Sequence, residues 1–139
     1  MHKLINDNLA IGLCNIQGGL TSLAKTLELQ ELVFREQLDI IGINETNLKS
    51  DINTSTLNLP LNFDFLRCDR PNDKGRGGCG MLVNQSVNYK LISLDITYSD
   101  LSKIEAIWIQ LKDANLYICC FYRSHNFCHL DKFLDYYYY

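Results

Sequence analysis

Two polar residues follow apolar runs in this chain in the way that ligand-binding residues often follow buried strands. Glu45 comes directly after the predominantly apolar stretch 39–44, and Asn15 comes after the apolar run 10–14. Layered α/β folds place ligand sites at such strand ends. Carboxylate and amide oxygens suit a hard cation such as Mg²⁺, which keeps most of its water. The pair therefore indicates part of a cation site. The simpler alternatives are a solvated glutamate and an asparagine that bonds its own turn.

A basic, glycine-rich segment supplies the second candidate for chemistry. Residues 67–80 contain the cations Arg67, Arg70, Lys74 and Arg76 together with several glycines. Glycine lets backbone amides approach a phosphate closely, and arginine pairs with it. The segment lacks the spacing of a P-loop, and a mobile hairpin is the alternative interpretation.

The third candidate lies at the end of the strand-like run 116–122. Tyr122 can donate its hydroxyl to a phosphate, and the adjacent Arg123 can pair with one. The alternative is an aromatic residue that covers the edge of the core. The first candidate thus points to a cation, and the second and third each point to a phosphate group.

The elements that must position these residues form an α/β pattern. A strand over 9–16, a helix from Thr21 or Ser22 to about Gln37 and a strand over 39–44 predict a right-handed parallel βαβ unit. The helix is expected to carry one apolar stripe, made of Leu20, Leu23, Leu27 and Phe34 with Leu32 and Val33 nearby. Further strands are predicted over 63–67, 80–84, 89–95, 105–111 and 116–122, with Trp108 in the core, and a helix is predicted to begin within 129–139.

Length and composition limit the classes of protein that remain. The 139 residues suffice for one domain with a real core, and the formal net charge of -3 argues against a generally basic nucleic-acid-binding surface. No apolar run is long enough for a membrane span and no signal peptide is recognisable, so we expect an intracellular protein, nuclear or cytoplasmic, without a membrane partner.

The six cysteines indicate buried reduced thiols. A zinc site is the alternative near the C-terminus, but the spacing there matches no common zinc motif. Its candidate ligands would be Cys119, Cys120, His125, Cys128 and His129.

Taken in order, these motifs resemble the endonuclease/exonuclease/phosphatase superfamily. They are most similar to the endonuclease domains of non-LTR retrotransposons. The resemblance rests on Asn15, the run 39–48 around Glu45, the segment 67–83, the run 105–109 and Tyr122-Arg123. It covers nearly the whole chain.

The resemblance implies a four-layer α/β sandwich, with two mixed sheets face to face and helices outside. It implies a DNA-nicking phosphodiesterase that depends on Mg²⁺, with Mn²⁺ as an alternative. By the resemblance Glu45 holds the metal, Asn15 lies in the same site and Tyr122 contacts the scissile phosphate. DNA-backbone contacts are assigned to four arginines, which are Arg67, Arg70, Arg76 and Arg123.

The chain departs from the family pattern after Tyr122. No Asp-x-Asn element and no Ser-Asp-His element follows it, and Ser124 stands where the family usually has proline. We therefore interpret residues 1–139 as a single incomplete domain, truncated at the C-terminus. Without the general-base groups we expect little or no nuclease activity from these residues alone. A non-catalytic module that binds nucleic acid or protein is the alternative function.

Overall fold

The computed structural model describes residues 8–70, 75–93 and 104–123. The elements along the chain are β1 (Ile11–Asn15), α1 (Leu23–Arg35), β2 (Ile40–Asn44), the short 3₁₀ helix η1 (Thr54–Thr56), β3 (Phe63–Cys68), β4 (Cys79–Asn84), β5 (Tyr89–Ile92), β6 (Glu105–Leu111) and β7 (Leu116–Tyr122). The predicted strands are therefore present, with small shifts at their ends. The helix predicted within 129–139 lies outside the described residues.

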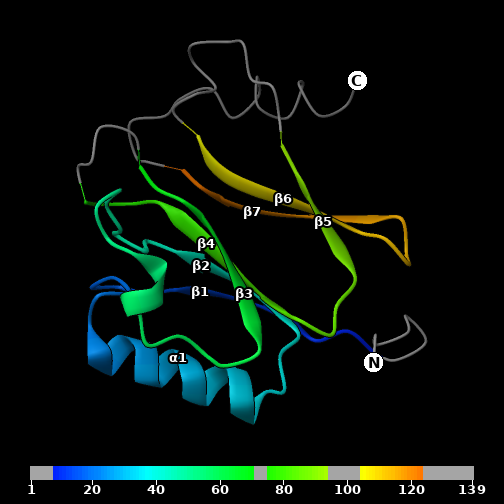
Figure 1. The fold of residues 1–139 in the computed structure, drawn as a ribbon, viewed down its shortest axis with the longest axis horizontal. Coiled ribbons are helices and arrows are strands. Elements are labelled where there is room, and N and C mark those ends of the chain that lie inside the picture. Colours follow the sequence, from blue (N-terminus) through cyan, green and yellow to red (C-terminus); the bar gives the residue numbers. More distant parts are fainter. Residues whose placement is uncertain (1–7, 71–74, 94–103, 124–139) are drawn as a thin grey trace.

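The strands form two sheets that lie face to face, and α1 covers the outer face of the first (Figure 1). The first sheet has the order β1-β2-β4-β3. In it β1 and β2 pair in parallel, and the other pairs are antiparallel. The second sheet, β5-β6-β7, is antiparallel in its described strands rather than mixed. The predicted α/β sandwich is confirmed, with three of its layers in the described residues.

Two hydrophobic clusters hold these layers together, and β2 and β4 contribute to both. Ile40 and Met81 face the second sheet, whereas Ile41, Ile43 and Leu82 face α1. All five side chains are fully buried. Residues that alternate between two apolar layers are typical of a central strand, as the continuous apolar run 39–44 predicted.

Helix α1 begins after Ser22 and ends in a turn stabilised by its own backbone. Gln37 has a left-handed φ of 50°. The amide of Gln37 donates to the carbonyl of Phe34, and the amide of Leu38 donates to that of Val33. This is the Schellman pattern, which satisfies the last carbonyls of a helix and turns the chain into the next strand.

The apolar stripe predicted for this helix was wrong in part. Leu20 is buried as expected, but Leu23, Leu27 and Phe34 are exposed. The buried face instead consists of Thr26, Leu29 and Val33. Thr26 can be buried because its hydroxyl donates to the carbonyl of Leu23 at 3.0 Å, which satisfies the polar group within the helix.

Two further features of the described residues bear on the expectations from sequence. Cys14, Cys68, Cys79, Cys119 and Cys120 are all free thiols, whereas Cys128 lies outside the described residues. Over the described ranges, no helix has the length and apolar character needed to cross a membrane.

Candidate phosphate and metal site

Glu45 directly follows β2 and is held in a left-handed backbone conformation with φ of 60°. The glycine-rich segment holds it there. The amide of Glu45 donates to the carbonyl of Gly78 at 3.0 Å, and the amide of Asn47 donates to that of Gly77 at 2.9 Å. The amide of Gly77 donates in return to the side-chain oxygen of Asn47 at 2.9 Å. A left-handed residue other than glycine costs about 1 kcal/mol or more, and such strain is concentrated at functional sites.

The side chain of Glu45 meets Tyr122, which ends β7 in the other sheet. The Tyr122 hydroxyl donates to Oε1 of Glu45 at 3.4 Å, so the contact joins residues that are 77 positions apart. Burial, followed by the nearby Glu45 carboxylate, raises the pKa of Tyr122 above its ordinary value. The hydroxyl therefore stays protonated at neutral pH and remains a hydrogen-bond donor. The structure thus brings together two of the residues predicted from sequence.

Glu105 and Arg70 lie on the other side of Tyr122. Glu105 and Tyr122 are cross-strand partners in the β6–β7 pair. The Glu105 side chain is only 1% exposed, and Nε of Arg70 lies 3.3 Å from its Oε1. A methyl group placed on Gly77 would lie 2.9 Å from the Tyr122 ring, 3.3 Å from Oε1 of Glu105 and 3.4 Å from the Arg70 guanidinium carbon. Three side chains from separate strands and loops therefore converge on the backbone of Gly77.

The sequence did not identify Glu105 as a site residue. Glutamate at the start of a strand is usually solvated, and nothing in the residue types of 105–111 marks this one as buried. Its pairing with Tyr122 across β6 and β7 could have identified it, because cross-strand partners lie on the same face of a sheet.

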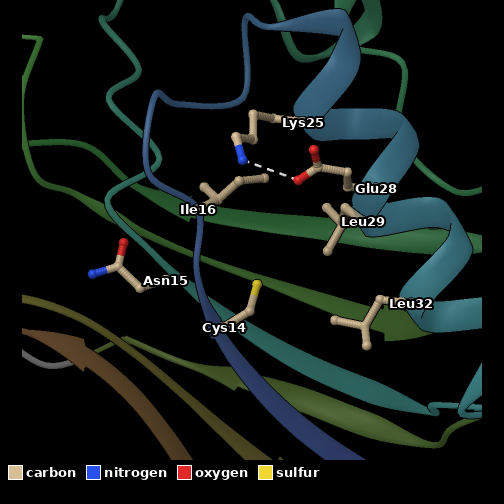
Figure 2. A pocket seen from close by; sticks show the side chains of 7 residues that line it. All are labelled: Cys14, Asn15, Ile16, Lys25, Glu28, Leu29 and Leu32. Carbon is tan, nitrogen blue, oxygen red and sulfur yellow. Dashed lines mark hydrogen bonds and ion pairs between the residues drawn. The ribbon is translucent and has the colours of Figure 1, made fainter.

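Asn15 ends β1 and pairs in parallel register with Asn44, one residue before Glu45. It also lines the rim of a small cavity of about 110 Å³ between β1 and α1. Figure 2 shows its amide directed away from α1 and from the Lys25–Glu28 ion pair of that cavity. Neither Glu45 nor Tyr122 lines this cavity, so we place the candidate chemistry at the strand ends and not in the cavity.

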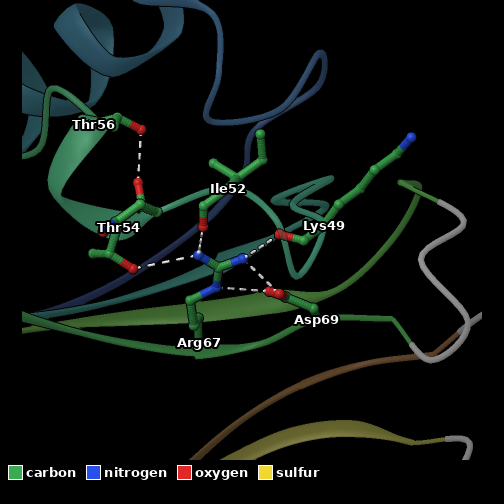
Figure 3. A network of polar contacts seen from close by, with 7 residues as sticks. Lys49, Ile52, Thr54, Thr56, Arg67 and Asp69 are labelled. Atoms are coloured by element: carbon green, nitrogen blue, oxygen red, sulfur yellow. Dashed lines mark hydrogen bonds and ion pairs between the residues drawn. The ribbon is translucent and has the colours of Figure 1, made fainter.

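The predicted arginines occupy different environments. Arg67 forms a two-pronged ion pair with Asp69, and its terminal nitrogens also donate to the carbonyls of Lys49 and Ile52 (Figure 3). A weaker bond of 3.3 Å joins it to Thr54. The Arg67 guanidinium thereby fixes the 49–54 loop against β3.

Arg70 lies at the site itself, beside Glu105. Arg76 is exposed next to Gly77, and Arg123 is exposed directly after Tyr122. Arg70 and Arg76 belong to the segment 67–80 and Arg123 follows β7, so all three lie close in sequence to residues of the site, whereas the guanidinium of Arg67 is engaged with the 49–54 loop.

The oxygen ligands at the strand ends are few, which limits the kind of cation that they could hold. Glu45 and Asn15 offer carboxylate and amide oxygens, which are hard ligands. Within the described residues no group of three or more His, Cys, Asp or Glu side chains gathers as in a metal cage. A cation that keeps several waters fits this sparse set, whereas a structural zinc ion would need four protein ligands.

Thiols lie next to the site between the two sheets. Cys68 and Cys79 are cross-strand partners, and a hydrogen bond from Cys79 lowers the pKa of Cys68 to about 7. The pKa of Cys79 is raised, first by its hydrogen bonds to Cys120 and Cys68 and then by burial. Within the pair of Cys68 and Cys79, Cys68 is therefore the thiol that ionises more readily.

Gly77→Ala is expected to destabilise the protein by about 2–4 kcal/mol, because alanine is strained at φ of 79° and its methyl would contact the Tyr122 ring. Gly18→Ala is the matched control. It also has a positive φ, but its added methyl would have no atom nearer than 4.0 Å, so we expect about 1 kcal/mol. Urea denaturation of both variants measures the difference. Equal losses would show that the three side chains do not pack against Gly77.

Comparison with known families identifies the class of protein. A model of the Endonuclease/Exonuclease/phosphatase family matches residues 12–128, which is most of the chain. The protein therefore belongs to this family. A search of curated protein sequences found no match.

Solved structures support the same fold. One is the endonuclease domain of TRAS1, a telomere-specific non-LTR retrotransposon, with a TM-score of 0.55 and 14% identity over 92% of this chain and 50% of that chain. Another is the AP endonuclease LMAP from Leishmania major, with a TM-score of 0.58 and 15% identity over 90% of this chain and 42% of that one. The chain thus spans about half the length of these structures.

Proposed function

We propose that the chain is part of a Mg²⁺-dependent phosphodiesterase domain of the DNA-endonuclease type, of retrotransposon origin. The observation that carries this proposal is the contact between the strained Glu45 and Tyr122 across the two sheets. It would bring a cation ligand next to a hydroxyl that can donate to a phosphate oxygen. Membership of the Endonuclease/Exonuclease/phosphatase family supports the reaction class. The order of the sequence motifs supports the retrotransposon origin.

Each residue has a distinct part in this proposal. Glu45 and Asn15 would hold Mg²⁺, or Mn²⁺ in its place, and the bound cation would supply charge stabilisation at the phosphoryl oxygens. Tyr122 keeps its proton and donates it in a hydrogen bond to a non-bridging oxygen of the phosphate. Arg70, Arg76 and Arg123 pair with the DNA backbone. Arg67 supports the 49–54 loop, and its assigned DNA contact is the weakest of the four because its nitrogens are already used.

We further propose that residues 1–139 form one incomplete domain that acts on DNA in the nucleus or cytoplasm. The residues after Tyr122 include no Asp-x-Asn or Ser-Asp-His element. These groups would orient the nucleophile and the leaving group. General acid–base groups contribute about 10²–10⁴-fold to a rate, so we expect the chain alone to nick DNA very slowly or not at all.

The test is nicking of supercoiled plasmid by the purified chain in Mg²⁺, with the TRAS1 endonuclease domain assayed beside it. We expect no nicking above background, and binding of the plasmid that weakens as salt rises. Glu45→Ala is the control variant. Clear nicking that Glu45→Ala abolishes would overturn the predicted inactivity while supporting the site. Nicking that survives the substitution would contradict the site.

A further inference from the structure

Glu105 is a buried carboxylate for which the proposed chemistry has no role. Its side chain is 1% exposed, and neither carboxylate oxygen accepts a hydrogen bond from a described residue. Burying an ionised carboxylate is costly unless a partner compensates for the lost water. Its ion-pair partner among the described residues is Arg70, whose Nε lies 3.3 Å from Oε1 without the alignment of a hydrogen bond.

Arg70 is the group that this carboxylate holds. Its side chain is 26% exposed, and only Nε faces Glu105. The two terminal amino groups have no hydrogen-bond partner among the residues described. A guanidinium fixed at Nε keeps its terminal fork free for a planar, two-pronged contact with phosphate oxygens. Arg70 is therefore anchored on one side and open on the other.

The guanidinium of Arg70 lies near Tyr122, the other side chain that could donate a hydrogen bond to a phosphate. A methyl group placed on Gly77 would lie 3.4 Å from the guanidinium carbon of Arg70 and 2.9 Å from the ring of Tyr122. Tyr122 in turn donates to Glu45. The buried Glu105 is thus linked through the two donors, Arg70 and Tyr122, to Glu45. Glu45 is the candidate cation ligand.

We infer that Glu105 is a positioning residue, which orients Arg70 so that its terminal nitrogens bind the same phosphate as Tyr122. This inference rests on the proposed function. Arg70 then pays less conformational entropy on binding, because its long side chain is already ordered. Glu105 itself does not touch the ligand.

The sign of the effect distinguishes positioning from simple electrostatics. Glu105→Gln removes a negative charge near an anion site, so electrostatics alone predicts tighter phosphate binding. Positioning predicts weaker binding, by about tenfold or more, because a charge-assisted contact is worth at least that factor. The probes are inorganic phosphate and a short fluorescein-labelled DNA duplex, measured in Ca²⁺ to prevent turnover.

The experiment uses the full chain and a double-mutant cycle. Arg70→Ala and Glu105→Gln are each expected to weaken binding of both probes, and the double variant is expected to bind no worse than Arg70→Ala alone. Unchanged or tighter binding by Glu105→Gln would overturn the inference, and so would losses that simply add. Arg76→Ala is the control for a generally lowered positive charge, and it should leave the effect of Glu105→Gln unchanged.

A measurement on the unmodified chain covers the case in which a variant does not fold. In the ¹⁵N NMR spectrum the Nε–H signal of Arg70 should shift when inorganic phosphate is added. An Arg70 signal that phosphate does not move would overturn the inference. If phosphate and DNA bind through Tyr122 but not through Arg70, only the inference fails. If neither probe binds the unmodified chain, the proposed function fails with it.

Discussion

Replacing Glu45 with glutamine is expected to weaken the binding of Mn²⁺, a spectroscopic substitute for Mg²⁺, by about tenfold or more. Glutamine keeps the size of the side chain and one oxygen, but it removes the negative charge that a hard cation requires. Glu45 is also the carboxylate that the fold holds in a strained backbone conformation through Gly78. The loss of free Mn²⁺ signal in electron paramagnetic resonance measures the affinity directly.

Glu28→Gln is the matched control for this experiment. Glu28 is an exposed carboxylate on α1 that pairs with Lys25 at 3.0 Å, and it lies at the cavity away from Glu45. An acidic chain binds some Mn²⁺ nonspecifically, and both variants lose one such charge. We expect Glu28→Gln to leave the strongest binding unchanged. Equal effects of the two substitutions would mean that Glu45 is no specific ligand.

Leu29→Ala is expected to lower the free energy of unfolding by about 2–5 kcal/mol. The Leu29 side chain is 3% exposed and packs between α1 and the first sheet. Its removal leaves a cavity in the cluster that also holds Ile41 and Ile43, which lie just before Glu45. The same substitution is therefore expected to weaken Mn²⁺ binding by loosening the end of β2.

Leu27→Ala supplies the comparison on the same helix. Leu27 is 50% exposed, so we expect a change within about 0.5 kcal/mol. Urea denaturation followed by circular dichroism measures both variants, and the two slopes should agree if only stability changes. A larger loss for Leu27 than for Leu29 would contradict the packing of α1 and would restore the apolar stripe predicted from sequence.

The helix illustrates what a pattern can and cannot predict. The existence and length of α1 followed from its apolar spacing, but apolar residues occur on more than one side of it. The side that packs was decided by the sheet, and it includes Thr26, whose hydroxyl bonds within the helix. A rule that counts only apolar residues misses a buried threonine of this kind.

In strand β6, too, the apolar pattern did not identify the buried face. The error affects the candidate site, because Glu105 lies on that face. Its bounds were predicted correctly, but Trp108 was assigned to the core. The buried residues are Glu105, Ile107, Ile109 and Leu111, so Trp108 lies half-buried on the opposite face. Because both faces of β6 carry apolar side chains, the sequence did not show which face is buried. Glu105 was missed for the same reason.

The candidate site was predicted in its parts but not in its geometry. Glu45, Asn15 and Tyr122 were identified from their positions at strand ends and from the family resemblance. The contact between Glu45 and Tyr122 depends on how the sheets pack, because Tyr122 reaches Glu45 from the other sheet. The use of Arg67 as a support for the 49–54 loop likewise depends on partners that are distant in sequence.

Paramagnetic broadening by Mn²⁺ in the amide NMR spectrum is the most direct test of a cation site at Glu45. We expect the amides of Glu45, Gly78 and Tyr122 to broaden first, while those of Leu29 and Leu111 remain sharp at the same Mn²⁺ concentration. Broadening centred on the Lys25–Glu28 cavity, or spread evenly over the acidic surface residues, would contradict it.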